Sequence, residues 1–224
     1  MAEPRFVAVG ELTRVRAFTR RDVDRWLAWP RHVDPLYAIY DPLPMDGSLR
    51  DAWYDDLVYR QGQLPFAIET YDRQMIGRLF LRHVRRSEGS SVLGIDLDPR
   101  FVGRGHGTDA LEAFLGYYFG PAGFSRLLLS VAAYNVRARR SYRRCGFRER
   151  ATHWESWQVG VDVLGDPRYA ELRQVFRRGQ RGVEALMHEM VAEKVPEASG
   201  GSPALWRRAG DARARGAALG GPAC

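Results

Sequence analysis

Three glycines at alternate positions, Gly103, Gly105 and Gly107, separate an apolar segment from a segment with helical periodicity. Glycine lets the backbone come close to a ligand, and the first N–H groups of a helix have no partner inside it, so they attract an anion. The pattern predicts a phosphate-binding loop, with a purely structural turn as the alternative. It is neither a Walker loop, which ends in Gly-Lys-Ser/Thr, nor the GxGxxG loop of a dinucleotide-binding fold. We expect His106, between two of these glycines, to point into solvent.

A second motif follows on the far side of an apolar strand. It consists of Asn135, Val136, Arg137, Ala138, Tyr142, Gly146 and Phe147. In order and spacing, the two motifs together resemble the GNAT acetyltransferase superfamily. Residues 15–22 and the turn at residues 73–77 also resemble the branch that contains ribosomal-protein N-terminal and spermidine acetyltransferases. The resemblance covers about residues 10–165.

The resemblance implies an α+β fold of the GNAT type, a mixed, mostly antiparallel twisted sheet flanked by helices. It implies direct transfer of an acetyl group from acetyl-CoA, as co-substrate, to a primary amine through a tetrahedral intermediate. Backbone N–H groups of residues 103–108 would bind the pyrophosphate, the strand before them would pair with the pantetheine arm, and Tyr142 would protonate the departing thiolate. The cofactor-binding residues implied in this way are Ile95, Leu97, Val102, Gly103, Arg104, Gly105, Gly107, Thr108 and Asn135.

The general base is left open by the resemblance. A primary amine is mostly protonated at neutral pH, so a carboxylate or an ordered water has to take its proton. Many relatives carry Glu two residues before the glycine of this strand, where this chain has Val92. Asp96 shares a strand face with Val92 by the period of two and is the leading candidate, and Glu69 is the second. The alternative for both is a solvated or ion-paired carboxylate.

Strand and helix patterns alternate along the first three quarters of the chain. Strands are predicted over residues 12–18, 65–69, 75–84, 91–98, 126–132, 147–158 and 159–164. Helices are predicted over residues 21–28 and 48–59, after the glycine loop, and over residues 135–145. Ser48 and Asp51 are expected to form a capping box at the start of the second helix.

Three regions follow from this pattern. Residues 1–165 are predicted to form the GNAT acetyltransferase domain, and residues 166–195 a helical extension of one or two helices. Residues 196–224 are rich in Gly, Ala, Ser and Arg, with little to bury, and predict a disordered tail.

Composition excludes several classes of protein. Of 224 residues, 45% are hydrophobic, which is ordinary for a globular protein, and two are cysteine, too few for a disulfide framework or a zinc-ligand quartet. The histidines share no metal-ligand spacing, so we expect no metal site. No stretch is apolar enough to span a membrane and the start lacks the apolar segment of a secretory signal, so we expect a cytoplasmic protein without a membrane partner.

The net charge of +7 has an uneven distribution. Residues 30–72 hold eight acidic and three basic residues, so the basic excess lies in the rest of the chain. An acid-rich region suits a cationic acceptor, such as a polyamine, an aminoglycoside or a protein N-terminus. Two other hypotheses about function remain. One is a sensor that binds acetyl-CoA without catalysis, and the other, less favoured, is a nucleic-acid-binding module built on the Arg-rich helix. A homodimer is also possible.

Overall fold

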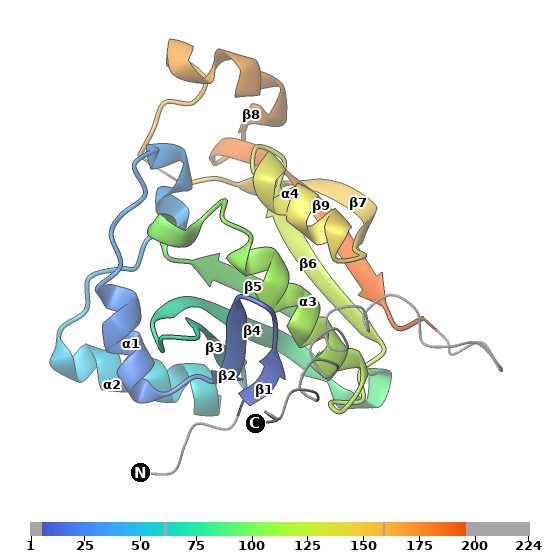
Figure 1. The fold of residues 1–224 in the computed structure, drawn as a ribbon. Helices are drawn as coiled ribbons and strands as arrows, with labels where there is room; N and C mark the ends of the chain where they lie inside the picture. Colours follow the sequence, from blue (N-terminus) through green and yellow to red (C-terminus); the bar gives the residue numbers. More distant parts are fainter. Residues whose placement is uncertain (1–5, 61, 159, 196–224) are drawn as a thin grey trace, which may run out of the picture. The chain divides into compact units, whose positions relative to one another are not determined.

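In residues 6–60, 62–158 and 160–195, which this computed structural model describes, nine strands form one open mixed sheet (Figure 1). Their order is β1-β2-β3-β4-β5-β6-β9-β7, with β8 paired to β9. β5 and β6 run parallel, and the other neighbouring strands run antiparallel, which confirms the predicted sheet. The strands are β1 (Phe6–Val9), β2 (Thr13–Ala17), β3 (Leu64–Thr70), β4 (Met75–Arg85), β5 (Ser90–Leu97), β6 (Arg126–Ala132), β7 (Arg148–Ser156), β8 (Phe176–Gly179) and β9 (Gly182–Glu193).

Helices flank the sheet. The α-helices of the described residues are α1 (Arg20–Leu27), α2 (Gly47–Asp55), α3 (His106–Phe119) and α4 (Val136–Arg144). Shorter helical turns are η1 (Pro35–Tyr40), η2 (Asp56–Arg60), η3 (Arg86–Glu88), η4 (Pro99–Phe101) and η5 (Pro167–Val175). None of the helices in the described part of the chain is both long and apolar enough to cross a membrane.

Alternation along the strands divides the core into two layers. Phe66 and Ile68 of β3 belong to the cluster that packs against α3, whereas Ala67 between them belongs to the cluster that packs against Val23 and Trp26 of α1. The sheet therefore separates α3 from α1. The apolar face predicted for α3 is buried as expected, at Leu111, Phe114, Leu115 and Tyr118.

The predicted helical extension is instead part of the sheet. η5 leads into β8 and β9, and β9 lies between β6 and β7. The sequence misleads because Val183, Met187 and Met190 recur at helical spacing, whereas pairing with two strands decides the structure. One unit therefore extends to Lys194, beyond the predicted domain boundary. The tail predicted for residues 196–224 lies outside the described residues.

Two local predictions are also wrong. In its described part, the strand predicted over residues 159–164 is a turn, because oxygens of Asp162 accept backbone N–H groups from three and four residues later, at 3.0 and 2.8 Å. The capping residue of α2 is Asp46, whose carboxylate accepts the N–H of Leu49 at 2.9 Å. Ser48 donates its hydroxyl to the same carboxylate at 3.0 Å, so it supports the cap rather than forming it.

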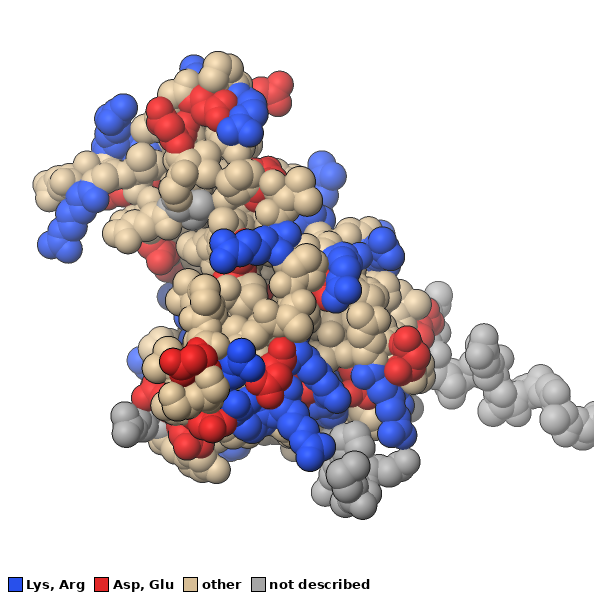
Figure 2. Space-filling view, turned by 90° about the vertical axis from the view of Figure 1, so that its left-hand side faces the viewer, with Lys and Arg blue, Asp and Glu red and all other residues tan. Residues whose placement is uncertain are grey.

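Acidic and basic side chains are interspersed on the side of the molecule that carries α1 and α2 (Figure 2). Arg20 pairs with Asp51 and, at 3.1 Å, with Asp24, and Arg50 pairs with Asp24 at 3.0 Å. Part of the negative charge in the acid-rich stretch is therefore neutralised within the protein.

Candidate active site

β5 and β6 pair only at their beginnings. The first three residues of β5 pair with residues 126–128 of β6, and β5 then continues to Leu97 and β6 to Ala132 without a further pair between them. The backbone N–H and C=O groups on this edge of β5 are therefore open to an extended ligand, which can add to a strand edge through main-chain hydrogen bonds. Ile95 and Leu97, both predicted to bind cofactor, lie on this open segment.

The three glycines of the loop after β5 have different roles. Gly103 and Gly105 adopt φ values of +81° and +88°, in the left-handed region that favours glycine, and Gly105 is the N-cap of α3. A Cβ at Gly107 would lie 2.8 Å from the Leu97 side chain, so this glycine allows α3 to start directly against the end of β5. The N–H of Asp109 donates to the Gly105 carbonyl at 3.0 Å, so the N–H groups of residues 106–108 precede the first helical hydrogen bond.

Asp109 fixes this loop to the β1–β2 hairpin. Its carboxylate accepts the N–H groups of Glu11 and Leu12 at 2.7 and 3.1 Å and the hydroxyl of Thr13 at 2.6 Å. A Cβ at Gly10 would lie 2.3 Å from the same carboxylate, so the turn requires glycine. The sequence did not predict β1, and this carboxylate shows how it is held.

We expect Asp109→Ala to lower the free energy of unfolding by about 2 kcal/mol, because it leaves three donors without their charged acceptor. Urea unfolding monitored by circular dichroism measures the change. Glu112→Ala, on an exposed position of the same helix, is the matched control and should have a small effect. Equal losses for the two variants would contradict the anchoring role.

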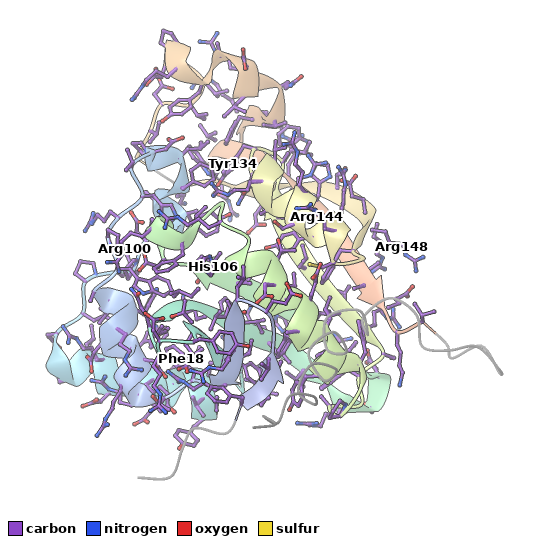
Figure 3. The ribbon with its side chains drawn as sticks, viewed as in Figure 1. Phe18, Arg100, His106, Tyr134, Arg144 and Arg148 are labelled. Carbon is purple, nitrogen blue, oxygen red and sulfur yellow. The ribbon has the colours of Figure 1, made fainter. Side chains whose placement is uncertain are left out.

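The other side chains of the loop differ in how far they are exposed to solvent. His106, at the start of α3 (Figure 3), is half-buried rather than directed into solvent. Its ring packs edge-on against Phe101, with centroids 5.4 Å apart. Its Nδ1 is buried and has no hydrogen-bond partner within the described residues. Arg104 is exposed, Val102 is half-buried at the end of η4, and Thr108 accepts the thiol of Cys145 through its carbonyl at 3.8 Å.

Asn135 caps α4. It is buried, and its side-chain oxygen accepts the N–H of Ala138 at 3.2 Å. Tyr40, on η1, lies close to the side chains of Asn135 and Tyr134, which influence the pKa of its phenol. Gly146 ends the helix with a φ of +88°, as predicted. The predicted cofactor residue Asn135 therefore fixes the direction of α4 and links it to η1.

Tyr142 lies on α4, within electrostatic range of Asp96. Burial raises the pKa of its phenol above the ordinary value, and the nearby Tyr40, Asp96 and Cys145 raise it further. The hydroxyl is therefore protonated at neutral pH and can donate a proton. Its ring packs against Phe147 at 5.8 Å. Tyr142 and Asp96, two of the three predicted catalytic residues, are therefore close enough to influence each other electrostatically.

Asp96 has an arginine partner. Nε and a terminal nitrogen of Arg78, its neighbour across β4 and β5, donate to Asp96 Oδ2 at 2.8 and 2.7 Å. The guanidinium carbon of Arg78 in turn lies 3.9 Å from the centroid of Trp26. Because both contacts go to Oδ2, Oδ1 is the oxygen that can accept a proton or a substrate N–H.

Glu69 is placed elsewhere, with β4 between its own strand and β5. It is 3% exposed and accepts from Arg14 at 3.0 Å and from Arg16 at 2.7 Å. Arg16 also pairs with the fully buried Asp22 at 2.7 Å. Burial would raise the pKa of Asp22, but the hydrogen bonds from Arg16 and Thr19 outweigh it and lower that pKa below its usual value. This ion-pair cluster accounts for a buried Glu69 without a catalytic role.

Three tyrosines near Asp96 and Tyr142 were not predicted as site residues. Tyr37 packs against Tyr40 and Tyr134, with ring centroids 6.4 and 5.9 Å apart, and His32 pairs with Asp41 at 2.7 Å beside them. Tyr134 lies just beyond β6 (Figure 3). For Tyr134, the one indication in the sequence was its position next to the predicted Asn135. Tyr37 and Tyr40 lie on η1, which is far from α4 along the chain.

The arginines of α4 are partly neutralised. Arg139 and Arg143 both donate to Glu149 of β7, at 2.8 and 2.5 Å. These hydrogen bonds lower the pKa of Glu149 to about 2. Two of the basic residues that suggested a nucleic-acid surface are thus engaged within the protein.

Residues 13–148 match the family model described as an acetyltransferase (GNAT) domain. The chain belongs to the GNAT acetyltransferase family. It is therefore an acyltransferase, as the two motifs indicated. Members of this family use acetyl-CoA. No group of three or more His, Cys, Asp or Glu side chains in the described part of this acetyltransferase could hold a metal ion.

Solved structures share the fold of this acetyltransferase. Spermidine N-acetyltransferase from Vibrio cholerae, in complex with CoA and spermine, is 17% identical over 81% of this chain and 95% of its own, with a TM-score of 0.63. A GNAT-family acetyltransferase from Bacillus anthracis is 13% identical over 84% of this chain and 98% of its own, with a TM-score of 0.60. Likeness at this level of identity shows the fold.

Proposed function

We propose that this acetyltransferase moves the acetyl group of acetyl-CoA directly to a primary amine held on the face of β5 that bears Asp96. The observation that carries the proposal is that the features needed to bind acetyl-CoA follow one another along the chain. An open strand edge, a glycine loop and a helix N-terminus follow one another from Ile95 to Thr108, and a protonated phenol, Tyr142, lies within electrostatic range of Asp96 on the same strand. Together they provide what an extended pantetheine arm, a pyrophosphate and a departing thiolate require.

The residues divide the chemistry among them. The backbone of Ile95 and Leu97 would bind the pantetheine arm and supply an N–H to the developing oxyanion. The N–H groups of residues 103–108 would bind the pyrophosphate, with Val102 and Arg104 beside it. Asp96, directly or through water, would take the proton of the amine, and Tyr142 would give one to the thiolate.

We expect Gly107→Val to weaken acetyl-CoA binding by about tenfold or more, because its side chain would overlap Leu97 and displace the start of α3. Titration calorimetry gives the Kd. Gly116→Val in the same helix is the matched control, since a Cβ there meets nothing within 4 Å. The proposed loop would be wrong if both variants bound acetyl-CoA as the parent does.

The acceptor is the open part of the proposal. The acid-rich stretch favours a cationic amine, a polyamine, an aminoglycoside or a peptide N-terminus, and one structural neighbour holds spermine. Several of these carboxylates already have partners, among them Asp51 and Glu69. A primary amine as the acetyl acceptor is therefore better supported than an acceptor with several positive charges.

A screen of primary amines with acetyl-CoA, read as thiol release, tests the function. Turnover with at least one class of amine is the expected result. Binding of acetyl-CoA without turnover across the screen would favour the sensor, and salt-dependent DNA binding without acetyl-CoA affinity would favour the nucleic-acid module.

A further inference from the structure

A small hollow lies between α2, η2 and strands β3 and β4. Its volume is about 190 Å³, and its walls combine aromatic, aliphatic and basic side chains. These walls include Phe18, Trp53, Leu57, Arg78, Phe80 and Arg82. Arg78 is shared with the candidate active site, because it donates to Asp96.

Phe80 connects the hollow to β5. Its ring covers Gly94, where a Cβ would lie 2.2 Å from the ring, so the aromatic side chain lies against the backbone of the strand that carries Asp96. A molecule in contact with Phe80 therefore lies near Gly94, two residues along β5 from the proposed proton acceptor Asp96.

The hollow suits one apolar group. A cavity of about 150 Å³ lined by apolar side chains can hold a benzene ring. A volume near 190 Å³ is well below that of a site for a whole drug-sized ligand. Phe18, Trp53 and Leu57 supply apolar walls, so a ring-sized group fits their chemistry.

The charge of the hollow is positive. Guanidinium carbons of Arg78 and Arg82 lie 5.3 and 5.4 Å from the centroid of the Phe80 ring. Arg78 has Asp96 as its counter-ion, whereas Arg82 is exposed and forms no ion pair with any carboxylate of the described residues. An unpaired guanidinium at the edge of an apolar hollow is complementary to a carboxylate.

We propose that this hollow selects a zwitterionic acceptor, a primary amine that also bears a carboxylate and an apolar ring. The amine lies at Asp96, the ring in the hollow against Phe80, and the carboxylate on Arg82. The inference rests on the proposed function and narrows its acceptor. A polyamine, with positive charge along its length, would meet Arg82 as a like charge.

The transfer step balances without a further reactant. The ammonium group loses one proton to Asp96 or water, and the free amine forms an N–C bond to the acetyl carbon. The C–S bond of acetyl-CoA breaks as the amide forms, and Tyr142 protonates the thiolate. The amide nitrogen loses its second proton, which returns through water to the Tyr142 phenolate. The products are the N-acetyl amino acid, CoA thiol and one proton.

Matched probes test the inference. We would compare kcat/KM for tryptophan with tryptamine and for phenylalanine with phenethylamine, pairs that differ only in the carboxylate, and include spermidine as the polycation. The expected result is a preference of about tenfold or more for the carboxylate-bearing member of each pair. In Arg82→Ala this preference disappears, mainly through KM, and in Arg82→Glu it reverses.

Arg85→Ala is the matched control, since Arg85 lies on the same strand and pairs with Glu88 at 3.2 Å outside the hollow. Equal turnover within each pair, or a preference for spermidine, would overturn the zwitterionic acceptor and leave the acetyltransferase intact. Absence of turnover with every amine would instead count against the proposed function. Melting curves of each variant separate lost recognition from lost folding.

Discussion

Tyr142→Phe is expected to lower kcat by about 100- to 1000-fold and to leave the Kd for acetyl-CoA unchanged. The substitution removes only the hydroxyl, so the contact of the ring with Phe147 is kept. Burial raises the pKa of Tyr142, so the lost group is a proton donor across the neutral range. Steady-state kinetics with the best amine of the screen, together with titration calorimetry for acetyl-CoA, separate the two effects.

Two variants sharpen this test. Tyr71→Phe removes a hydroxyl that donates to the carbonyl of Gly10 at 2.7 Å, away from β5, and should leave kcat unchanged. Tyr40→Phe removes the neighbouring phenol, whose pKa burial also raises. Full activity of Tyr142→Phe combined with a large loss in Tyr40→Phe would transfer the proton-donating role to η1.

Arg16→Met is expected to produce the largest loss of stability, about 3 to 5 kcal/mol, because it leaves two buried carboxylates without their shared cation. Arg16 is 5% exposed and bonds to Asp22 at 2.7 and 2.9 Å and to Glu69 at 2.7 Å. Arg25→Met is the control, since Arg25 contacts the same Asp22 from a half-exposed position and should contribute about 1 kcal/mol or less. Urea unfolding at neutral pH compares them, and similar losses would contradict the argument.

Acid titration gives an independent measure of the same cluster. The pKa of Asp22 is lower in the folded protein than its usual value. The stability it contributes is therefore present above the unfolded pKa of about 3.9 and is lost as pH falls through the folded pKa. The parent protein should lose stability below about pH 4, and Arg16→Met should lose less over the same range.

The parts of the site that could be predicted from the sequence are those formed by residues close together in the chain. The glycine loop, the buried face of α3 and the cap of α4 by Asn135 depend on residues within a few positions of one another, so spacing in the sequence contains them. The partners of Asp96 and Glu69 do not follow from spacing. Arg78 is 18 residues from Asp96, and Arg14 is 55 residues from Glu69. Only the register of the strands brings these charges together.

The same distinction accounts for β9 and for Tyr40. The apolar residues of β9 fit a helix as well as a strand, and the choice depends on β6 and β7, whose sequences lie far upstream. Tyr40 reaches Asn135 across nearly one hundred positions of the chain, through the packing of η1. Contacts of this kind form only when the chain has folded. The sequence therefore predicted the Asn135 motif but not which aromatic residues surround it.

Because β9 pairs with both β6 and β7, this part of the sheet can form only after β9 has been synthesised. Among the described residues, β7 joins the sheet only through β9, and β9 is the strand that is synthesised last. Until residue 193 has emerged, both β6 and β7 present unpaired edges, and such edges attract other chains. Truncation or cleavage within β9 would therefore remove an interior strand and leave the edges of β6 and β7 unpaired.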